Sequence, residues 1–514
     1  MIRTMAATAR GLLLAPLAVL ILSSCGGGGM TTEGASSTAS GAGTQPSVAP
    51  ANEDPCGIEG TGIGIRDCPN PNPPTPNSGP TIADVTPHCA PVGAQAFTLR
   101  ADTWNLVANS VLRWNGSDLP STVDLSAGQI SAQIPASDIA TAGTAVITLF
   151  TPGPGGGSSS PVSFPIVTGG TNPLSIAVNP TGRFAYVANQ GCLGSFAGSV
   201  SMYKIGPTGT LSSLGTIPAG SAPISIAIDP LGRFAYVANR DSNDVSTYTM
   251  DPNTGVLTPS GRTALGASPW SITLDPSGRF AYLANSLGND VLMYAIDPNT
   301  GALTSMGSTV PETGPLQTPW AGPISVTVDP LGRFAYVAIQ GDGGDLTSGS
   351  VSVYTINPNT GVLTFTGRAE GSCGASVSVC GPASVAIDRS NKFAVAVGGY
   401  GGVSLYNINA MTGSLTSVDA VNAGRSRAVA LDPTGKFAYV ANFGSNDVST
   451  YNIDVRGGTL TLKGAIPAGS SPSAIAIAPS GEFAYVTNYG SNDVSIYSID
   501  AVTGDLTLIA SIGT

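Results

Sequence analysis

The chain has 514 residues, of which only 10% are charged, whereas glycine (67 residues) and proline (40 residues) are abundant. This composition disfavours long helices and favours short strands joined by tight turns, so we predict an all-β chain of two or three domains. The net charge of −11 argues against nucleic acid as a partner, because nucleic-acid binding needs a basic surface.

Residues 1–24 have the features of a secretory signal peptide. Two arginines precede an apolar run, Leu12–Leu22, that is about half as long as a membrane-spanning helix. The run leads into "LSSC", which resembles the lipobox of bacterial lipoproteins and implies that Cys25 is acylated. With Gly26 after it, the resemblance implies an exported protein in the cell envelope, at the outer membrane, that touches the membrane only through its lipid anchor. The alternative is an ordinary signal peptide followed by an unrelated cysteine.

Residues 25–79 are rich in glycine, serine, threonine, proline and asparagine, and they have few apolar residues. Because such a segment cannot bury a core, we expect a disordered tether.

Six cysteines follow Cys25 in a chain expected to be exported, where disulfides are stable. We predict a Cys373–Cys380 disulfide because these two residues lie close together in the sequence. No CxxC pair occurs, so the sequence gives little support to a zinc or redox site. The sequence leaves open the pairing of the other four, which are Cys56, Cys68, Cys89 and Cys192.

Residues 80–167 contain the short apolar or alternating runs "AFTLRA", "VLRW", "QISAQI" and "AVITLF", which predict strands. The stretches "ADVTPHCAPVGAQAFTLRA", "VLRWNGSDLPS" and "IPASDIATAGTAVITLFTPGPGGGSSSPVSFPI" resemble the IPT/TIG family of immunoglobulin-like domains. The resemblance implies a small β-sandwich that spaces or binds rather than catalyses.

Residues 171–514 repeat one unit seven times, and a repeat of this kind decides the fold. The second unit predicts four strands: Ile224–Ile228, "RFAYVAN", Asp244–Met250 and "VLTPSG". The turns "DPLG" and "DPNTG" supply proline and glycine where tight turns need them. The phenylalanine that marks each unit is Phe184, Phe234, Phe280, Phe334, Phe393, Phe437 and Phe483.

Both alternating sets of side chains in "FAYVA" are apolar, which is typical of a strand covered on both faces. Four-stranded blades stacked around an axis provide such cover. "RFAYVAN" and its variants resemble the YVTN-type and lactonase-like propellers, which include relatives of 6-phosphogluconolactonase. Seven copies make seven blades, so we expect a seven-bladed β-propeller of the kind that the resemblance implies, and we expect a monomer.

The connections between the predicted strands differ in how constant they are. The turns after the first and third strands hardly change in length, whereas the other two connections expand in several units. We therefore expect the expanded connections to form the working face. On the opposite face we expect a solvated rim of basic residues, among them Arg183, Arg233, Arg279 and Arg333.

One register position at the start of the innermost strand is expected to ring the mouth of the central channel. Trp270 and Arg427 occupy it, and Trp320 and Arg425 lie in adjoining loops, so these four could bind a small anionic or sugar-like ligand. Alternatively, Trp270 fills the channel and the arginines pair with nearby acids. In units 1 to 7 the residue is Leu174, Ile224, Trp270, Ile324, Ala383, Arg427 and Ser473.

An asparagine recurs at the end of the second strand, and a ring of amides could line a binding site or hold Ca²⁺, the one cofactor that the sequence suggests. The alternative is that each side chain hydrogen-bonds to its own loop. The residues are Asn189, Asn239, Asn285, Asn442 and Asn488.

The chain has one histidine, His88, which lies outside the repeat. A lactone hydrolase built on this propeller would therefore depend on Arg427 with Glu312 or Glu370 as a base, or on a metal-activated water. We favour a non-catalytic envelope protein whose propeller binds an envelope protein, a polysaccharide or a small ligand, in adhesion, envelope organisation or polymer capture. The alternative is a lactonase-like hydrolase of a sugar lactone or similar ester.

Overall fold

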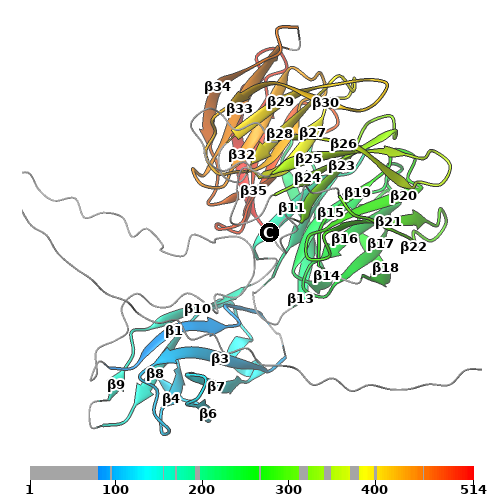
Figure 1. Ribbon diagram of the computed structural model, residues 1–514. Helices are drawn as coiled ribbons and strands as arrows, with labels where there is room; N and C mark the ends of the chain where they lie inside the picture. The colour runs from blue at the N-terminus through cyan, green and yellow to red at the C-terminus, as the bar shows by residue number, and fades with distance from the viewer. Residues whose placement is uncertain are drawn as a thin grey trace, which may run out of the picture. The chain divides into compact units, whose positions relative to one another are not determined.

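The computed structural model describes residues 79–92, 95–153, 156–167, 171–191, 197–265, 268–311, 322–340, 349–370, 381–398, 402–454 and 456–514. Apart from one short 3₁₀ helix, η1 (Ala136–Ile139), every regular element in these ranges is a β-strand (Figure 1). The predicted all-β class is therefore confirmed. No helix within these ranges has the length and apolar character that a membrane span requires.

The described residues between 79 and 167 form two sheets around one apolar core. One sheet has the strand order β1–β3–β7–β6, and the other has the order β2–β10–β8–β4–β5, with β9 paired to β8. Phe164 lies at the centre of the core, with its ring centroid 5.9 Å from that of Phe97 and 5.1 Å from that of Trp114. The four strands expected here are present, while the IPT/TIG assignment stays a prediction. The strands are β1 (Thr81–Thr86), β2 (Ala90–Pro91), β3 (Phe97–Trp104), β4 (Val111–Trp114), β5 (Ser117–Asp118), β6 (Ser121–Asp124), β7 (Gln129–Ile134), β8 (Gly143–Thr151), β9 (Gly157–Ser158) and β10 (Val162–Val167).

From residue 171 on, the described chain forms seven sheets of four antiparallel strands, which we number blades 1 to 7 and whose strands we letter A to D. Strands A are β11 (Pro173–Val178), β15 (Pro223–Ile228), β19 (Pro269–Leu274), β23 (Pro323–Val328), β27 (Pro382–Ile387), β31 (Ser426–Leu431) and β35 (Pro472–Ile477). Strands B are β12 (Phe184–Asn189), β16 (Phe234–Asn239), β20 (Phe280–Asn285), β24 (Phe334–Ile339), β28 (Phe393–Gly398), β32 (Phe437–Asn442) and β36 (Phe483–Asn488). Strands C are β13 (Ala197–Ile205), β17 (Asp244–Met250), β21 (Asp290–Ile296), β25 (Ser350–Ile356), β29 (Gly402–Ile408), β33 (Asp447–Asp454) and β37 (Asp493–Ile499). Strands D are β14 (Leu211–Ser221), β18 (Leu257–Ala264), β22 (Leu303–Thr309), β26 (Leu363–Glu370), β30 (Leu415–Val421), β34 (Thr459–Pro467) and β38 (Leu506–Gly513).

The blades close into a ring. Strand A of every blade lies beside strand A of the next, and β35 of blade 7 lies beside β11 of blade 1 in the same way. Each blade contains all four of its own strands, so no strand is shared across the closing junction. The sequence had left the mode of closure open.

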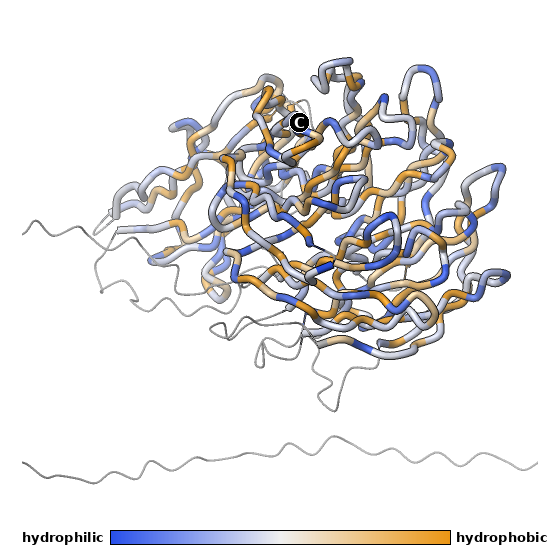
Figure 2. The backbone as a smooth tube through the Cα atoms, turned by 90° about the horizontal axis from the view of Figure 1, so that it is seen from above, coloured by the Kyte–Doolittle hydropathy of each residue, from blue (hydrophilic) through white to orange (hydrophobic). Residues whose placement is uncertain are grey.

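Strand B is covered on both faces, as its composition predicted. Phe234, Tyr236 and Ala238 of β16 pack into a core shared with blade 3, whereas Ala235 and Val237 pack into a core shared with blade 1. Figure 2 shows apolar stretches along the strands and hydrophilic residues at many of the turns. Seven such cores, one between each pair of neighbouring blades, hold the ring together.

A second contact between blades joins strand B to the C–D turn of the next blade. The Tyr236 hydroxyl donates a hydrogen bond of 2.9 Å to the carbonyl oxygen of Gly301, and a Cβ atom on Gly301 would lie only 2.6 Å from the Phe234 ring. Gly301 also has a φ of +72°, so the turn requires glycine for two reasons. The same bond recurs in six blades, from Tyr186 to Gly255, Tyr236 to Gly301, Tyr282 to Gly361, Tyr336 to Gly413, Tyr439 to Gly504 and Tyr485 to Gly209.

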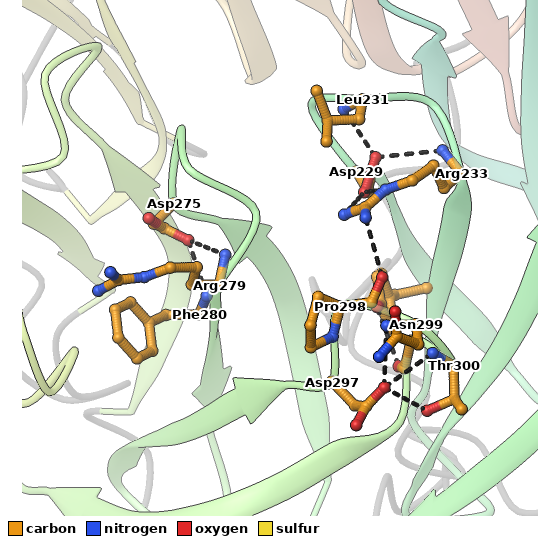
Figure 3. A network of polar contacts seen from close by, with 12 residues as sticks. Asp229, Leu231, Arg233, Asp275, Arg279, Phe280, Asp297, Pro298, Asn299 and Thr300 are labelled. Atoms are coloured by element: carbon orange, nitrogen blue, oxygen red, sulfur yellow. Dashed lines mark hydrogen bonds and ion pairs between the residues drawn. The ribbon is translucent and has the colours of Figure 1, made fainter.

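The basic residues expected as a solvated rim take part in this contact (Figure 3). Arg233 forms a bidentate pair with Asp229 of its own A–B turn, at 2.9 and 2.7 Å, and donates a hydrogen bond of 2.9 Å to the Pro298 carbonyl of blade 3. Arg279 donates a hydrogen bond to the Pro358 carbonyl of blade 4 in the same way. The A–B and C–D turns therefore lie on one face, where they join neighbouring blades.

Blade 5 departs from this pattern. Val395 stands where six other blades have the tyrosine, so the junction between blades 5 and 6 lacks that hydroxyl bond. The ring of Phe393 packs instead near Gly435 in the A–B turn of blade 6. The Asp419 carboxylate supplies a different link by accepting a hydrogen bond of 2.7 Å from the backbone N–H of Leu460.

We predict that Tyr236→Phe lowers the free energy of unfolding by about 1 kcal/mol, because the Gly301 carbonyl loses its buried donor while the ring stays in place. Denaturant unfolding of the full chain measures the change. A midpoint equal to that of the native protein, at an unchanged slope, would contradict a stabilising role for this bond.

Candidate functional site

The B–C and D–A connections lie together on the face opposite the A–B turns. The backbone N–H of Gly220, at the end of strand β14 that leads into the D–A connection, donates a hydrogen bond of 3.1 Å to Asn239 Oδ1 at the end of β16. The backbone N–H of Ser221 likewise donates to Ser242 Oγ in the B–C connection, at 3.0 Å. The expanded loops that suggested a working face fall largely on residues 192–196, 312–321, 341–348 and 371–380, outside the described residues, so that interpretation stays a prediction.

The recurring asparagines are buried, and their amides bond within their own blades. Asn239 Nδ2 donates to Asp244 Oδ1 at 2.7 Å and to Ser246 Oγ at 2.9 Å, both on strand C. These partners belong to strand C and not to the loop, so both interpretations of the asparagines stay predictions. The exposed fractions are 0% for Asn189, Asn239 and Asn488 and 3% for Asn285 and Asn442. The other four side-chain N–H groups donate in pairs as follows: Asn189 to Ser201, Asn285 to Asp290, Asn442 to Asp447 and Asn488 to Asp493.

Trp270 and Arg427 are the second residues of β19 and β31, the corresponding position of two innermost strands. Trp270 is partly buried and packs against the core between blades 2 and 3. The guanidinium carbon of Arg427 lies 5.9 Å from the ring centroid of Phe443, which follows β32. Arg425 directly precedes β31, and Trp320 falls outside the described residues.

Arg240, which was not among the residues predicted from the sequence, lies beside Trp270 and acts electrostatically on Arg427. It follows β16, is only 7% exposed, and places its guanidinium carbon 5.7 Å from the centroid of the Trp270 ring. Its Nε donates to Asp241 Oδ1 at 2.8 Å, while its Nη2 is buried and has no hydrogen-bond partner among the described residues. The sequence held a signal, since the residue after strand B is Gln190, Arg240, Ser286, Gln340, Phe443 and Tyr489 in blades 1 to 4, 6 and 7.

Two further arginines, Arg240 and Arg425, influence Arg427 electrostatically. Burial is the main cause that lowers the pKa of Arg427, and the positive charges of Arg240 and Arg425 lower this pKa further, whereas Tyr489 opposes the change. At Arg427, therefore, desolvation and the charges of Arg240 and Arg425 disfavour the charged state, and we call these three residues the arginine cluster.

Most of the remaining predicted residues lie outside the described part of the chain. Glu370 is the last residue of β26, but its side chain lies outside the described part, as does the whole of Glu312. Cys25, Cys373 and Cys380 also lie outside it, so the lipidation site and that disulfide stay predictions. Cys89 is buried and disulfide-bonded. His88 lies between β1 and β2, 3.5 Å from the Asp84 carboxylate.

Within the described residues, no group of three or more histidine, cysteine, aspartate or glutamate side chains is placed to hold a metal ion. The buried asparagine amides already contact serine or aspartate side chains of their own blades.

Seven four-stranded sheets closed around an axis define a seven-bladed β-propeller. The lactonase family of seven-bladed β-propellers matches residues 164–274, 259–427 and 419–512, and the chain belongs to this family. The lactonase-like resemblance of the repeat is thereby confirmed.

Solved structures agree with the fold. Candidate 6-phosphogluconolactonases from Bacteroides uniformis and Bacteroides fragilis are 22% and 24% identical to this chain, each with a TM-score of 0.54. The alignments cover 62% and 66% of this chain and 93% and 95% of those chains. Hydrazine synthase from Kuenenia stuttgartiensis aligns with 22% identity, a TM-score of 0.50, and coverage of 65% of this chain and 96% of its own. No curated protein matches the chain. Because the aligned structures have different named activities, the likeness establishes the fold and not the reaction.

We predict that Arg427→Leu raises the free energy of unfolding by about 1 kcal/mol, because it removes a desolvated charge that neighbouring arginines repel. Arg233→Leu is the matched control and lowers the free energy of unfolding by about 1 kcal/mol or more, because it leaves the buried Asp229 carboxylate without its partner. Denaturant unfolding of both variants measures the difference. A loss of stability in Arg427→Leu would show that this arginine serves the fold.

Proposed function

We propose that the protein is a lactone hydrolase that acts on a sugar lactone or a similar ester at the mouth of the propeller. The observation that carries the proposal is the arginine cluster beside Trp270, in a chain that belongs to the lactonase family. The names of the Bacteroides structures support the same class of substrate. This reverses the order of the two functions that the sequence alone favoured.

The arrangement suits the chemistry of lactone opening. Attack of water on the ring carbonyl places negative charge on the carbonyl oxygen, and a guanidinium group held nearby stabilises that charge. An indole face such as that of Trp270 packs against the apolar face of a sugar ring. In the proposal Glu370 or Glu312 accepts the proton of the attacking water, and the products are a carboxylate and the freed hydroxyl group.

The test is hydrolysis of a panel of neutral and phosphorylated sugar lactones by the purified full chain, corrected for the spontaneous rate. We expect Arg427→Leu to lower kcat/KM by about 100-fold, the usual effect of removing one oxyanion-stabilising group. Glu370→Gln tests the base, and Glu482→Gln, beside the A–B turn of blade 7, is its control. Absence of turnover above the spontaneous rate with every lactone would contradict the proposal.

A second function has one observation in its favour. The single histidine of the chain, His88, lies in the sandwich, so the propeller has no imidazole to act as a base. The arginine cluster would then bind a ligand without turning it over, in an envelope protein that captures a polymer, a small molecule or another protein. Binding without hydrolysis in the lactone panel would favour this function.

We also propose that the protein is exported and held at the outer membrane by acyl chains on Cys25, with residues 25–79 as a tether. The support is the apolar run followed by "LSSC". In a Gram-negative host grown with a clickable palmitate analogue, the full chain takes up the label and Cys25→Ala does not. Equal labelling of both forms, or of neither, would contradict lipidation at Cys25.

A further inference from the structure

Six of the seven junctions between blades repeat one pair of contacts. The tyrosine of strand B donates its hydroxyl to a glycine carbonyl of the next blade, and the phenylalanine two residues before it packs against the same glycine. Between blades 2 and 3 these residues are Tyr236, Phe234 and Gly301. The closing junction of blades 7 and 1 has both contacts too, with Tyr485 bonded to Gly209. The place where the chain closes the ring is therefore joined like the others.

The junction of blades 5 and 6 differs in both contacts. Val395 stands in the place of the tyrosine and has no hydroxyl group to donate. In the other six junctions a Cβ on the turn glycine would lie 2.2 to 2.6 Å from a phenylalanine ring. The turn glycine of blade 6 is Gly458, and the nearest atom to a Cβ there, outside its chain neighbours, belongs to Val418 of blade 5, at 3.5 Å. The C–D turn of blade 6 thus packs against strand D of blade 5, where the other turns pack against strand B.

Asp419 supplies a contact that is particular to this junction. The residue of strand D that stands opposite strand C at this level is glycine in five blades and alanine in blade 7, but in blade 5 it is Asp419. Its Oδ2 accepts a hydrogen bond of 2.7 Å from the backbone N–H of Leu460 in blade 6. The equivalent N–H of Leu257 in blade 2 donates instead to the buried sulfur of Met202, at 3.3 Å. Asp419 is partly exposed, so water competes for this acceptor and the bond contributes less than a buried one.

We propose that the ring opens first at the junction of blades 5 and 6, and that the bond between Asp419 and Leu460 controls this opening. Local opening of a folded protein takes place where the fewest contacts have to be broken, and this junction has exchanged a buried pair of contacts for a partly exposed one. The innermost strand of blade 6, β31, lies beside β27 of blade 5 and carries Arg427. Opening here therefore moves one side of the channel mouth away from its neighbour, without separating the two ends of the repeat.

Buried thiols compare the junctions directly. Val397→Cys places a thiol in the core between blades 5 and 6, Ala238→Cys places one in the core between blades 2 and 3, and Ala185→Cys places one in the core of the closing junction. All three native side chains are at most 1% exposed, so a thiol reagent reaches these positions only when a junction opens. Labelling of the folded full chain is followed at each position by peptide mass spectrometry, which separates the new thiol from the native cysteines.

We expect the thiol at position 397 to react at least about fivefold faster than those at positions 238 and 185, the effect of one lost hydrogen bond on an opening equilibrium. Thermal melts show that each variant is folded. Equal rates at the three positions, or the fastest reaction at position 185, would overturn the inference.

A second substitution tests the role of Asp419. Asp419→Ala, combined with Val397→Cys, speeds labelling at position 397 at least about threefold, and combined with Ala238→Cys it leaves labelling at position 238 unchanged. The matched control is Asp297→Ala, because that carboxylate accepts hydrogen bonds from Asn299 and Thr300 of its own turn. An equal effect of both substitutions at position 397 would remove Asp419 from the proposal.

Hydrogen exchange tests the same opening in the unsubstituted chain. The backbone N–H of Leu460 bonds across the junction of blades 5 and 6, as that of Leu257 does across the junction of blades 1 and 2. We expect the Leu460 amide to exchange at least about fivefold faster than the Leu257 amide under native conditions, measured by mass spectrometry with peptide fragmentation. Exchange at Leu460 that is equal or slower would overturn the inference even if Val397→Cys failed to fold. Neither measurement depends on whether the protein hydrolyses a lactone.

Discussion

The fold depends on the contact between strand B of one blade and the C–D turn of the next. The Phe234 ring fills the space that a side chain on Gly301 would take, and the Tyr236 hydroxyl bonds the carbonyl of the same glycine. Both faces of strand B are apolar, so a single blade would expose one of them to water. The blades are therefore stable as a closed ring, where every strand B is covered twice.

Because this contact lies on one face of the propeller, the two faces have different roles. The face with the A–B and C–D turns joins the blades, which explains why its arginines, aspartates and glycines recur and why its turns keep their length. The other face makes fewer of these contacts between blades. The second residue of strand A therefore varies between blades, from Leu174 to Trp270 and Arg427. Chemistry specific to this protein has room to develop there. Blade 5 shows that the tyrosine itself can be replaced. Val395 stands in its place, and the junction with blade 6 has the hydrogen bond from the Leu460 backbone N–H to the Asp419 carboxylate instead.

The closing junction obeys the same physics as the others. Tyr485 of blade 7 bonds Gly209 of blade 1 over a separation of 276 residues, as Tyr236 bonds Gly301 within 65. Ser473 adds a bond of 2.6 Å to the Pro173 carbonyl. Closure therefore comes from side-chain packing and hydrogen bonds between complete sheets, and it needs no exchanged strand.

The sequence by itself determined the elements: the strands, the turns and the seven units follow from local apolar patterning, proline and glycine, which act over a few residues. It also singled out Trp270 and Arg427, because the repeat puts them in one register position. Tertiary structure alone decided what faces them. Arg240 stands in another register position and another blade, and its buried Nη2, which has no partner among the described residues, is visible only when the ring brings blades 2, 3 and 6 around one axis. The repeat encodes contacts that recur, whereas the influence of Arg240 and Arg425 on Arg427 depends on how the closed ring brings different blades together.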